Sequence, residues 1–94
     1  MRPGEAFDRR IQAVLTLESE RPERCWWLAF AGKEGARGVV IIRAPGAVTA
    51  AARAHELGIN PGGQVESFPF PEEPPAGMSD RLLGEAELVK AGLV

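Results

Sequence analysis

The sequence predicts a small α+β domain, and three observations lead to this prediction. The chain has 94 residues, 45% of them hydrophobic, which suffices for one compact core. Two neighbouring segments, 25–31 and 37–43, are rich in aromatic and β-branched residues, as strands are. An alanine-rich segment follows at 47–57 and ends at a glycine, as helices do. We therefore expect a three- to four-stranded sheet in β-β-β-α-β order, with one main helix and a short C-terminal helix.

The first element, residues 10–18, fits two structures. Apolar residues occupy every second position from Ile11, which favours a strand. Phe7, Ile11 and Val14 also fall at helical spacing, so a helix is the alternative. Residues 19–24 contain a proline and are expected to form the turn that follows.

The segments 25–31 and 37–43 are predicted to be central strands joined by a hairpin loop over Gly32–Gly35. Both carry apolar side chains on both faces, which is typical of strands covered on two sides. Only one sizeable helix is available to cover them. The second face must therefore be covered by the C-terminal helix, by the N-terminal segment or by another copy of the chain. Because a large uncovered apolar face is unusual in a monomer, we expect a homodimer.

The main helix, 47–57, is expected to stop at Gly58 and to turn four residues toward the sheet: Val48, Ala51, Ala52 and His55. Residues 60–63 then have the Asn-Pro-Gly-Gly pattern of a type II turn. The strand predicted at 64–70 contains Pro69, which cannot donate to a neighbour, so this strand belongs at an edge.

The C-terminal part is expected to be a separate layer. Residues 1–70 form the predicted domain, and residues 71–79 form a proline-rich linker without core potential. Residues 80–94 form a helical tail packed on the domain, with Leu82 and Leu83 as its anchor. The tail helix begins with acidic residues and ends with a lysine, as the helix dipole favours.

Charge and cysteine content limit the possible functions. The net charge is −2, with nine bases and six acids in residues 1–53 and two bases and seven acids in residues 54–94. An acidic chain is a poor match for nucleic acid, so we expect no such partner. A single cysteine excludes an internal disulfide, and no apolar run approaches the roughly 20 residues of a membrane span. The first ten residues also lack the apolar run of a signal peptide, so we expect a cytoplasmic protein without a membrane partner.

Few residues are suited to catalysis. The chain has one histidine, His55, and one cysteine, Cys25, and therefore no set of ligands for a metal ion. We expect a buried, inert thiol and a histidine that packs on the helix or lies at its rim. The remote enzymatic alternative is a nucleophilic pair formed by these two side chains. The sequence thus predicts a non-enzymatic protein with no cofactor and no metal.

Several basic and glycine residues could instead bind an anion. Arg43 lies where a strand ends and the main helix begins, so the helix N–H groups with Arg43 and Arg37 could hold a phosphate or carboxylate. The turn at Gly62 and Gly63 could present further backbone donors. Plain helix capping and a purely structural turn are the alternatives. Lys33 lies in a glycine-rich loop that resembles a phosphate loop, but this loop joins two strands and predicts a hairpin.

Two adjacent tryptophans, Trp26 and Trp27, are expected to point to opposite faces of their strand. One of them belongs in the core, and the other lies under a second layer or at an interface, where tryptophan often contributes strongly to binding.

The segments Trp26–Phe30, Gly38–Ile42, Ala54–Val65 and Arg81–Leu83 resemble a family of short bacterial and phage proteins. The stretch Ala-His-Glu-Leu-Gly-Ile-Asn-Pro-Gly-Gly is the most specific part of this resemblance. The resemblance assigns no activity to any residue, but it implies a phage- or mobile-element-type accessory factor. With Arg37, Arg43 and the glycine turn it leads to a first hypothesis, an anti-defence factor that sequesters an anionic, nucleotide-like ligand. The alternative is an interaction factor that masks a host protein through an apolar and acidic surface.

Overall fold

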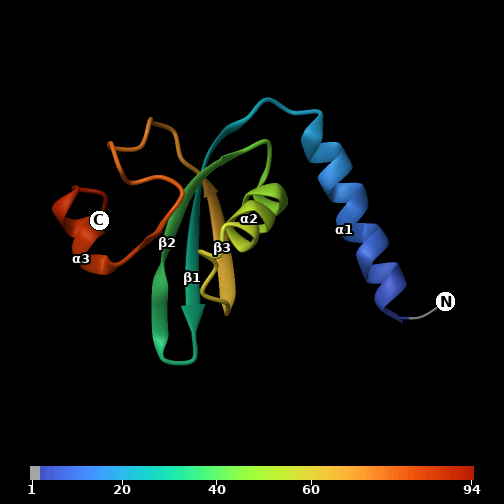
Figure 1. Ribbon diagram of the computed structural model, residues 1–94, viewed down its shortest axis with the longest axis horizontal. Coiled ribbons are helices and arrows are strands. Elements are labelled where there is room, and N and C mark those ends of the chain that lie inside the picture. The colour runs from blue at the N-terminus through green and yellow to red at the C-terminus, as the bar shows by residue number, and fades with distance from the viewer. Residues whose placement is uncertain (1–2) are drawn as a thin grey trace.

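A computed structural model describes residues 3–94, with side chains from residue 9 onward, as helices around a four-stranded antiparallel sheet (Figure 1). In chain order the elements are α1 (Pro3–Ser19), β1 (Arg24–Gly32), β2 (Gly35–Ala44), α2 (Ala47–Glu56), β3 (Gln64–Pro69), β4 (Leu82–Leu83) and α3 (Glu85–Lys90). The strand order is β3-β1-β2-β4. This confirms the small α+β fold class, the two central strands and the edge position of β3.

One face of the sheet is covered by α2. Leu28 and Val40 of the sheet are fully buried against Ala50 and Ala54 of this helix. The predicted inward stripe of Val48, Ala51, Ala52 and His55 is therefore wrong, because Val48 and His55 are exposed. The two buried alanines lie one helical turn apart, and their small side chains let the helix approach the sheet closely.

The opposite face is covered by the segment after β3. Ile41 of β2 is fully buried there against Met78, Leu83 and Leu88, which come from the C-terminal part of the chain. Figure 1 shows this segment and α3 on the side of the sheet away from α2. Among the described residues the chain itself thus covers both faces of its central strands, and the sheet does not need a second copy.

The N-terminal segment is a helix, so the expected strand at residues 10–18 is wrong. Ala, Arg, Gln, Leu and Glu dominate this segment, and these residues favour helix over strand. The alternative spacing of Ile11 and Val14 is the one that the structure adopts. Figure 1 shows α1 standing apart from the sheet, with its C-terminal end nearest α2. The radius of gyration, 14.2 Å, exceeds the roughly 12 Å of a compact chain of this length because α1 projects.

None of the helices in the described part of the chain has the length and apolar character that crossing a membrane requires.

Candidate functional site

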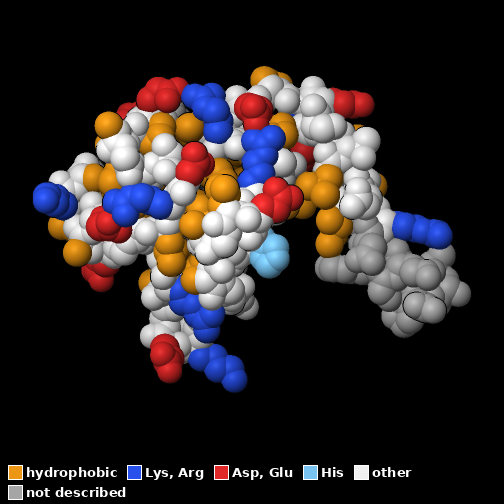
Figure 2. All heavy atoms as spheres, viewed as in Figure 1, with side chains coloured by type: hydrophobic (Ala, Val, Ile, Leu, Met, Phe, Trp, Pro, Cys, Tyr) orange, Lys and Arg blue, Asp and Glu red, His pale blue; other side chains and the backbone are white. Residues whose placement is uncertain are grey.

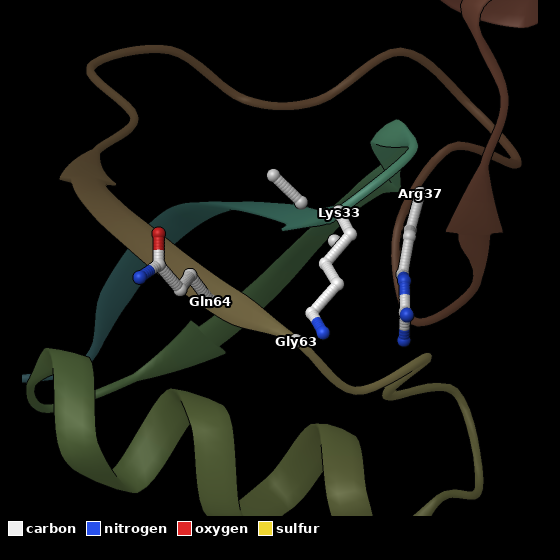
Figure 3. Close-up of a pocket in the computed structure, with 6 residues that line it drawn as sticks. Lys33, Arg37, Gly63 and Gln64 are labelled. Carbon is white, nitrogen blue, oxygen red and sulfur yellow. The ribbon is translucent and has the colours of Figure 1, made fainter.

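The best candidate for a binding site is an open cavity of about 390 Å³ at the tip of the β1–β2 hairpin (Figure 3). We call it the Arg37 cavity. It is lined by Ala31, Gly32, Lys33, Arg37, Gly63 and Gln64. The lining comes from the hairpin and from the start of β3, so residues more than 25 positions apart meet at one place. Among the described residues that line it two are basic, Lys33 and Arg37, and none is acidic.

Arg37 is positioned by an irregularity in the hairpin. Phe30 pairs with Gly38, but the next residue, Ala31, pairs with Ala36, so Arg37 is an extra residue between two pairs. Such a bulge redirects the side chain of the inserted residue. The guanidinium Nη1 donates a hydrogen bond of 2.9 Å to the carbonyl of Pro61. Arg37 therefore ties the hairpin to the turn that precedes β3.

Gly32 provides the space in which the guanidinium lies. A Cβ atom built on Gly32 would come within 2.6 Å of Nη2 and 2.8 Å of Cζ of Arg37. Any side chain here would displace the guanidinium, so the glycine helps to fix its place.

Lys33 adds a second positive charge. Figure 3 shows Lys33 and Arg37 extending in the same direction beside Gly63. Three ion pairs join described side chains, and they are Arg43–Glu73, Arg53–Glu23 and Arg81–Glu87. Neither Lys33 nor Arg37 takes part in one of them. Neither side chain therefore forms an ion pair with a described carboxylate.

Gly62 and Gly63 have clear structural roles in the turn. The backbone N–H of Gly62 donates to Oδ1 of Asn60 at 2.8 Å, which closes the turn locally. Gly63 has a φ of +88° and its Cα faces the carbonyl of Ala31, so no Cβ fits. The structure brings both glycines next to Arg37, as the binding hypothesis expected. The purely structural alternative also accounts for their presence.

Arg43 lies elsewhere. It is near the opposite end of β2 from Arg37, and the two residues are six positions apart along the strand, which corresponds to roughly 20 Å. Its side chain pairs with Glu73 at 2.7 Å. The expected joint site of Arg37 and Arg43 is therefore wrong.

The predicted anion site at the start of α2 is filled from within the chain. The carboxylate of Glu18 accepts hydrogen bonds from the backbone N–H groups of Val48, at 3.1 Å, and Thr49, at 2.8 Å. Gly46, which precedes the helix, lies directly against this carboxylate and leaves room for it. The alternative of plain helix capping is therefore the one that the structure adopts at this helix end, and the capping anion is a side chain of α1.

Glu18 is charged under ordinary conditions although it is only 6% exposed. Burial raises the pKa of Glu18, but the hydrogen bonds from Thr49 and Val48 and the charge of Arg21 outweigh burial. Its pKa consequently lies below the ordinary value of 4.5.

The two tryptophans pack on opposite faces of the sheet, as predicted. Trp26 packs against the α2 side, and its indole N–H donates to the carbonyl of Ala44 at 3.1 Å. Trp27 packs on the other side, where its ring stacks on Phe70 with centroids 6.0 Å apart. Both rings are half-buried within the chain. An interface at either one stays a prediction.

The remote Cys25–His55 pair does not form. Cys25 is buried on the face covered by the C-terminal segment, whereas His55 is exposed on α2, which covers the other face. Among the described residues, no group of three or more His, Cys, Asp or Glu side chains is placed to hold a metal ion.

Two members of the Arg37 cavity with polar side chains, Lys33 and Gln64, were not predicted as ligands. The prediction of a hairpin loop at Lys33 is correct, and the glycines around this residue are the signal in the sequence that points to a binding loop. Gln64 carries no such signal, because only the pairing of β1 with β3 brings it to the site.

Comparison with protein-family models, with curated proteins and with solved structures found no match to this chain. The resemblance to short bacterial and phage proteins therefore stays a prediction.

Proposed function

We propose that this protein is a non-enzymatic binding module that sequesters a small anionic, nucleotide-like ligand in the Arg37 cavity. The observation that carries the proposal is the pair of cations, Lys33 and Arg37, that line one cavity without a described carboxylate partner. Unpaired basic side chains that converge on a cavity are what a phosphate or carboxylate requires.

The geometry of Arg37 supports this proposal. A guanidinium has five N–H donors, and the Pro61 carbonyl accepts from one nitrogen only. The hydrogen bond to Pro61 and the space at Gly32 hold the planar group in place before any ligand arrives. Such preorganisation lowers the entropic cost of binding.

The size of the cavity supports a ligand larger than a bare phosphate group. About 390 Å³ lies within the range of small-molecule sites, which begins at about 300 Å³. The phosphate of a nucleotide would contact Lys33 and Arg37, and its sugar and base would lie in the open part of the cavity. We further propose that the protein acts in the cytoplasm as a homodimer, as an accessory factor of phage or mobile-element type.

The proposal is tested by titrating the wild-type protein with inorganic pyrophosphate and following backbone amides by NMR. We expect shifts confined to residues 31–37 and 61–64. Lys33→Ala should weaken binding about tenfold, because an opposite charge in direct contact is lost. Since Lys33 makes no described side-chain hydrogen bond, its removal leaves the fold intact.

Lys90→Ala is the matched control, because Lys90 is an exposed lysine at the end of α3. It should bind pyrophosphate as the wild type does. Equal binding by wild type and Lys33→Ala, or no shifts at all, would contradict the proposal. Native mass spectrometry of gently purified protein would then identify any ligand retained from the cells.

A second candidate function is the masking of a host protein, and one observation favours it. Phe68 on the edge strand β3 is 53% exposed and pairs in register with Trp27, next to Glu66. An exposed aromatic on an edge strand is a common docking element. Phe68→Ser should abolish capture of a host protein in pull-downs if this candidate is right, whereas Lys33→Ala should not.

A further inference from the structure

We propose that the free edge of β3 binds an extended, basic peptide as a further strand of the sheet. This mode of binding rests on the second candidate function, the masking of a host protein, and specifies the partner's chemistry. β1 pairs with β3 on one side, and no described strand pairs with its other side. Five of its six residues are exposed. Figure 1 places β3 on the outer side of β1, and Figure 2 shows open space beside the lower part of the sheet on this side.

One hydrogen bond shows which backbone groups of β3 face the free edge. The N–H of Phe70 donates to the carbonyl of Cys25 at 2.9 Å, which continues the β1–β3 register by one residue. In an antiparallel pair, residues that point their backbone groups to the partner alternate with residues that point them away. The even-numbered residues of β3 therefore face β1, and the backbone groups of Val65, Ser67 and Pro69 face outward. Pro69 fits this position, because its missing N–H leaves no bond to β1 unmade.

The outward groups of β3 require an extended backbone as their partner. Val65 and Ser67 each offer a donor and an acceptor, and Pro69 offers an acceptor only. Their spacing of two residues, about 7 Å, matches the repeat of another β-strand. An antiparallel strand at this edge would exchange two hydrogen bonds with each of Val65 and Ser67 and donate one to Pro69.

The side chains of β3 specify the peptide further. Glu66 and Phe68 would lie in the pairs of the added ladder that exchange no hydrogen bonds, where facing side chains are closest. Phe68 is 53% exposed and therefore available for such a contact. Opposite charges and aromatic–β-branched pairs stabilise cross-strand neighbours. We therefore expect a lysine or arginine opposite Glu66 and a β-branched residue opposite Phe68.

The charge of this region favours a basic peptide over a second copy of β3. Residues 64–77 contain three acids, Glu66, Glu72 and Glu73, and no base. Among the described ion pairs, only the one between Glu73 and Arg43 involves this segment. A second copy would bring another acidic segment against the first. A charge in the middle of an edge strand also opposes the pairing of identical edges.

The test is hydrogen exchange by NMR of the full chain with the capped peptide Thr-Ile-Thr-Lys-Val-Thr. In antiparallel register its isoleucine lies opposite Phe68 and its lysine opposite Glu66. The amides of Val65 and Ser67 should exchange rapidly in the free protein, and the peptide should slow both at least about tenfold. N-methylation of the peptide's second threonine, opposite Ser67, should abolish binding. N-methylation of its lysine is the matched control, because that N–H points away from β3.

A pair of variants tests the same edge from the side of the protein. Ser67→Pro removes an outward N–H and no bond to β1, so the urea midpoint should stay close to that of the wild type and peptide binding should weaken at least about tenfold. Ser67→Ala keeps the N–H and should bind like the wild type.

Three results would overturn strand addition. They are a peptide that leaves the exchange of Val65 and Ser67 unchanged, equal binding by the two N-methylated peptides, and slow exchange of both amides in concentrated protein without peptide, which would mean that a second copy occupies the edge. If Ser67→Pro still captures a host protein that Phe68→Ser loses, strand addition is wrong and the second candidate function stands.

Discussion

Two places in the described part of the molecule are suited to an anion, and the chain itself fills one of them. At the start of α2, two backbone N–H groups bind the carboxylate of Glu18. At the Arg37 cavity, Lys33 and Arg37 have no described carboxylate partner. The difference between the two places teaches that a group of bases or backbone N–H donors is a candidate site for a ligand only if no carboxylate of the chain already binds it.

The largest expected effect on stability comes from removing the charge of Glu18 at the start of α2. Glu18→Gln retains the shape of the side chain but removes its charge, so the two N–H groups lose their charge-assisted hydrogen bonds. We expect a loss of about 2 kcal/mol in the free energy of unfolding, measured by urea denaturation. Glu20→Gln is the control, because Glu20 is exposed and should cost almost nothing. Equal stability of the two variants would show that Glu18 does not hold α1 against α2.

The contribution of Glu18 to the free energy of unfolding depends on pH, and the direction of the lowered pKa gives the sign of this dependence. The pKa of Glu18 is lower in the folded chain than its ordinary value of 4.5, so its contribution is fully present above 4.5. It is lost as the pH falls through the lower, folded pKa. The stability difference between wild type and Glu18→Gln should therefore be constant near neutral pH and shrink below 4.5. A difference that persists unchanged into strong acid would contradict the assignment.

The sequence predicted those parts of the fold that depend on local signals. The β1–β2 hairpin and the end of α2 near Gly58 were predicted because aromatic, β-branched, alanine and glycine residues act within a few positions. The helix at residues 10–18 was not predicted, because the apolar residues there fit both the period-two spacing of a strand and the spacing of a helix. Helix propensity decided the outcome, and no strand of the sheet pairs with this segment.

The site depended on contacts that no local pattern encodes. Glu18 meets Val48 and Thr49 across 30 residues of sequence, so its role as the cap of α2 could not be predicted. Arg37, Gly62 and Gly63 were named together from the sequence. The position of Gln64 beside Arg37 could not be predicted, because a one-residue bulge and the β1–β3 register determine it. The face of α2 was wrong for a related reason. Alanines occur on several sides of α2, so a hydrophobic pattern does not single out the side that Ala50 and Ala54 form.

A medium effect should follow from moving Arg37 without removing its charge. Gly32→Ala adds one methyl group where the guanidinium lies, and this long side chain can move aside at little cost to folding. Since the φ of Gly32 is outside the left-handed region, the backbone tolerates alanine. We expect the affinity for pyrophosphate to fall about threefold to tenfold with an unchanged urea midpoint. Unaltered affinity in titration calorimetry would mean that the position of the guanidinium does not matter.

The smallest expected effect is that of Arg43→Ala, which removes a residue of the same type from the other end of the same strand. Arg43 already pairs with Glu73, and both side chains are more than half exposed. Exposed pairs contribute little, so the free energy of unfolding should change by no more than about 0.5 kcal/mol. Its roughly 20 Å separation from Arg37 implies unchanged pyrophosphate affinity. If Arg43→Ala weakened binding as much as Lys33→Ala does, overall basic charge would explain the affinity, and the Arg37 cavity would lose its claim to be the site.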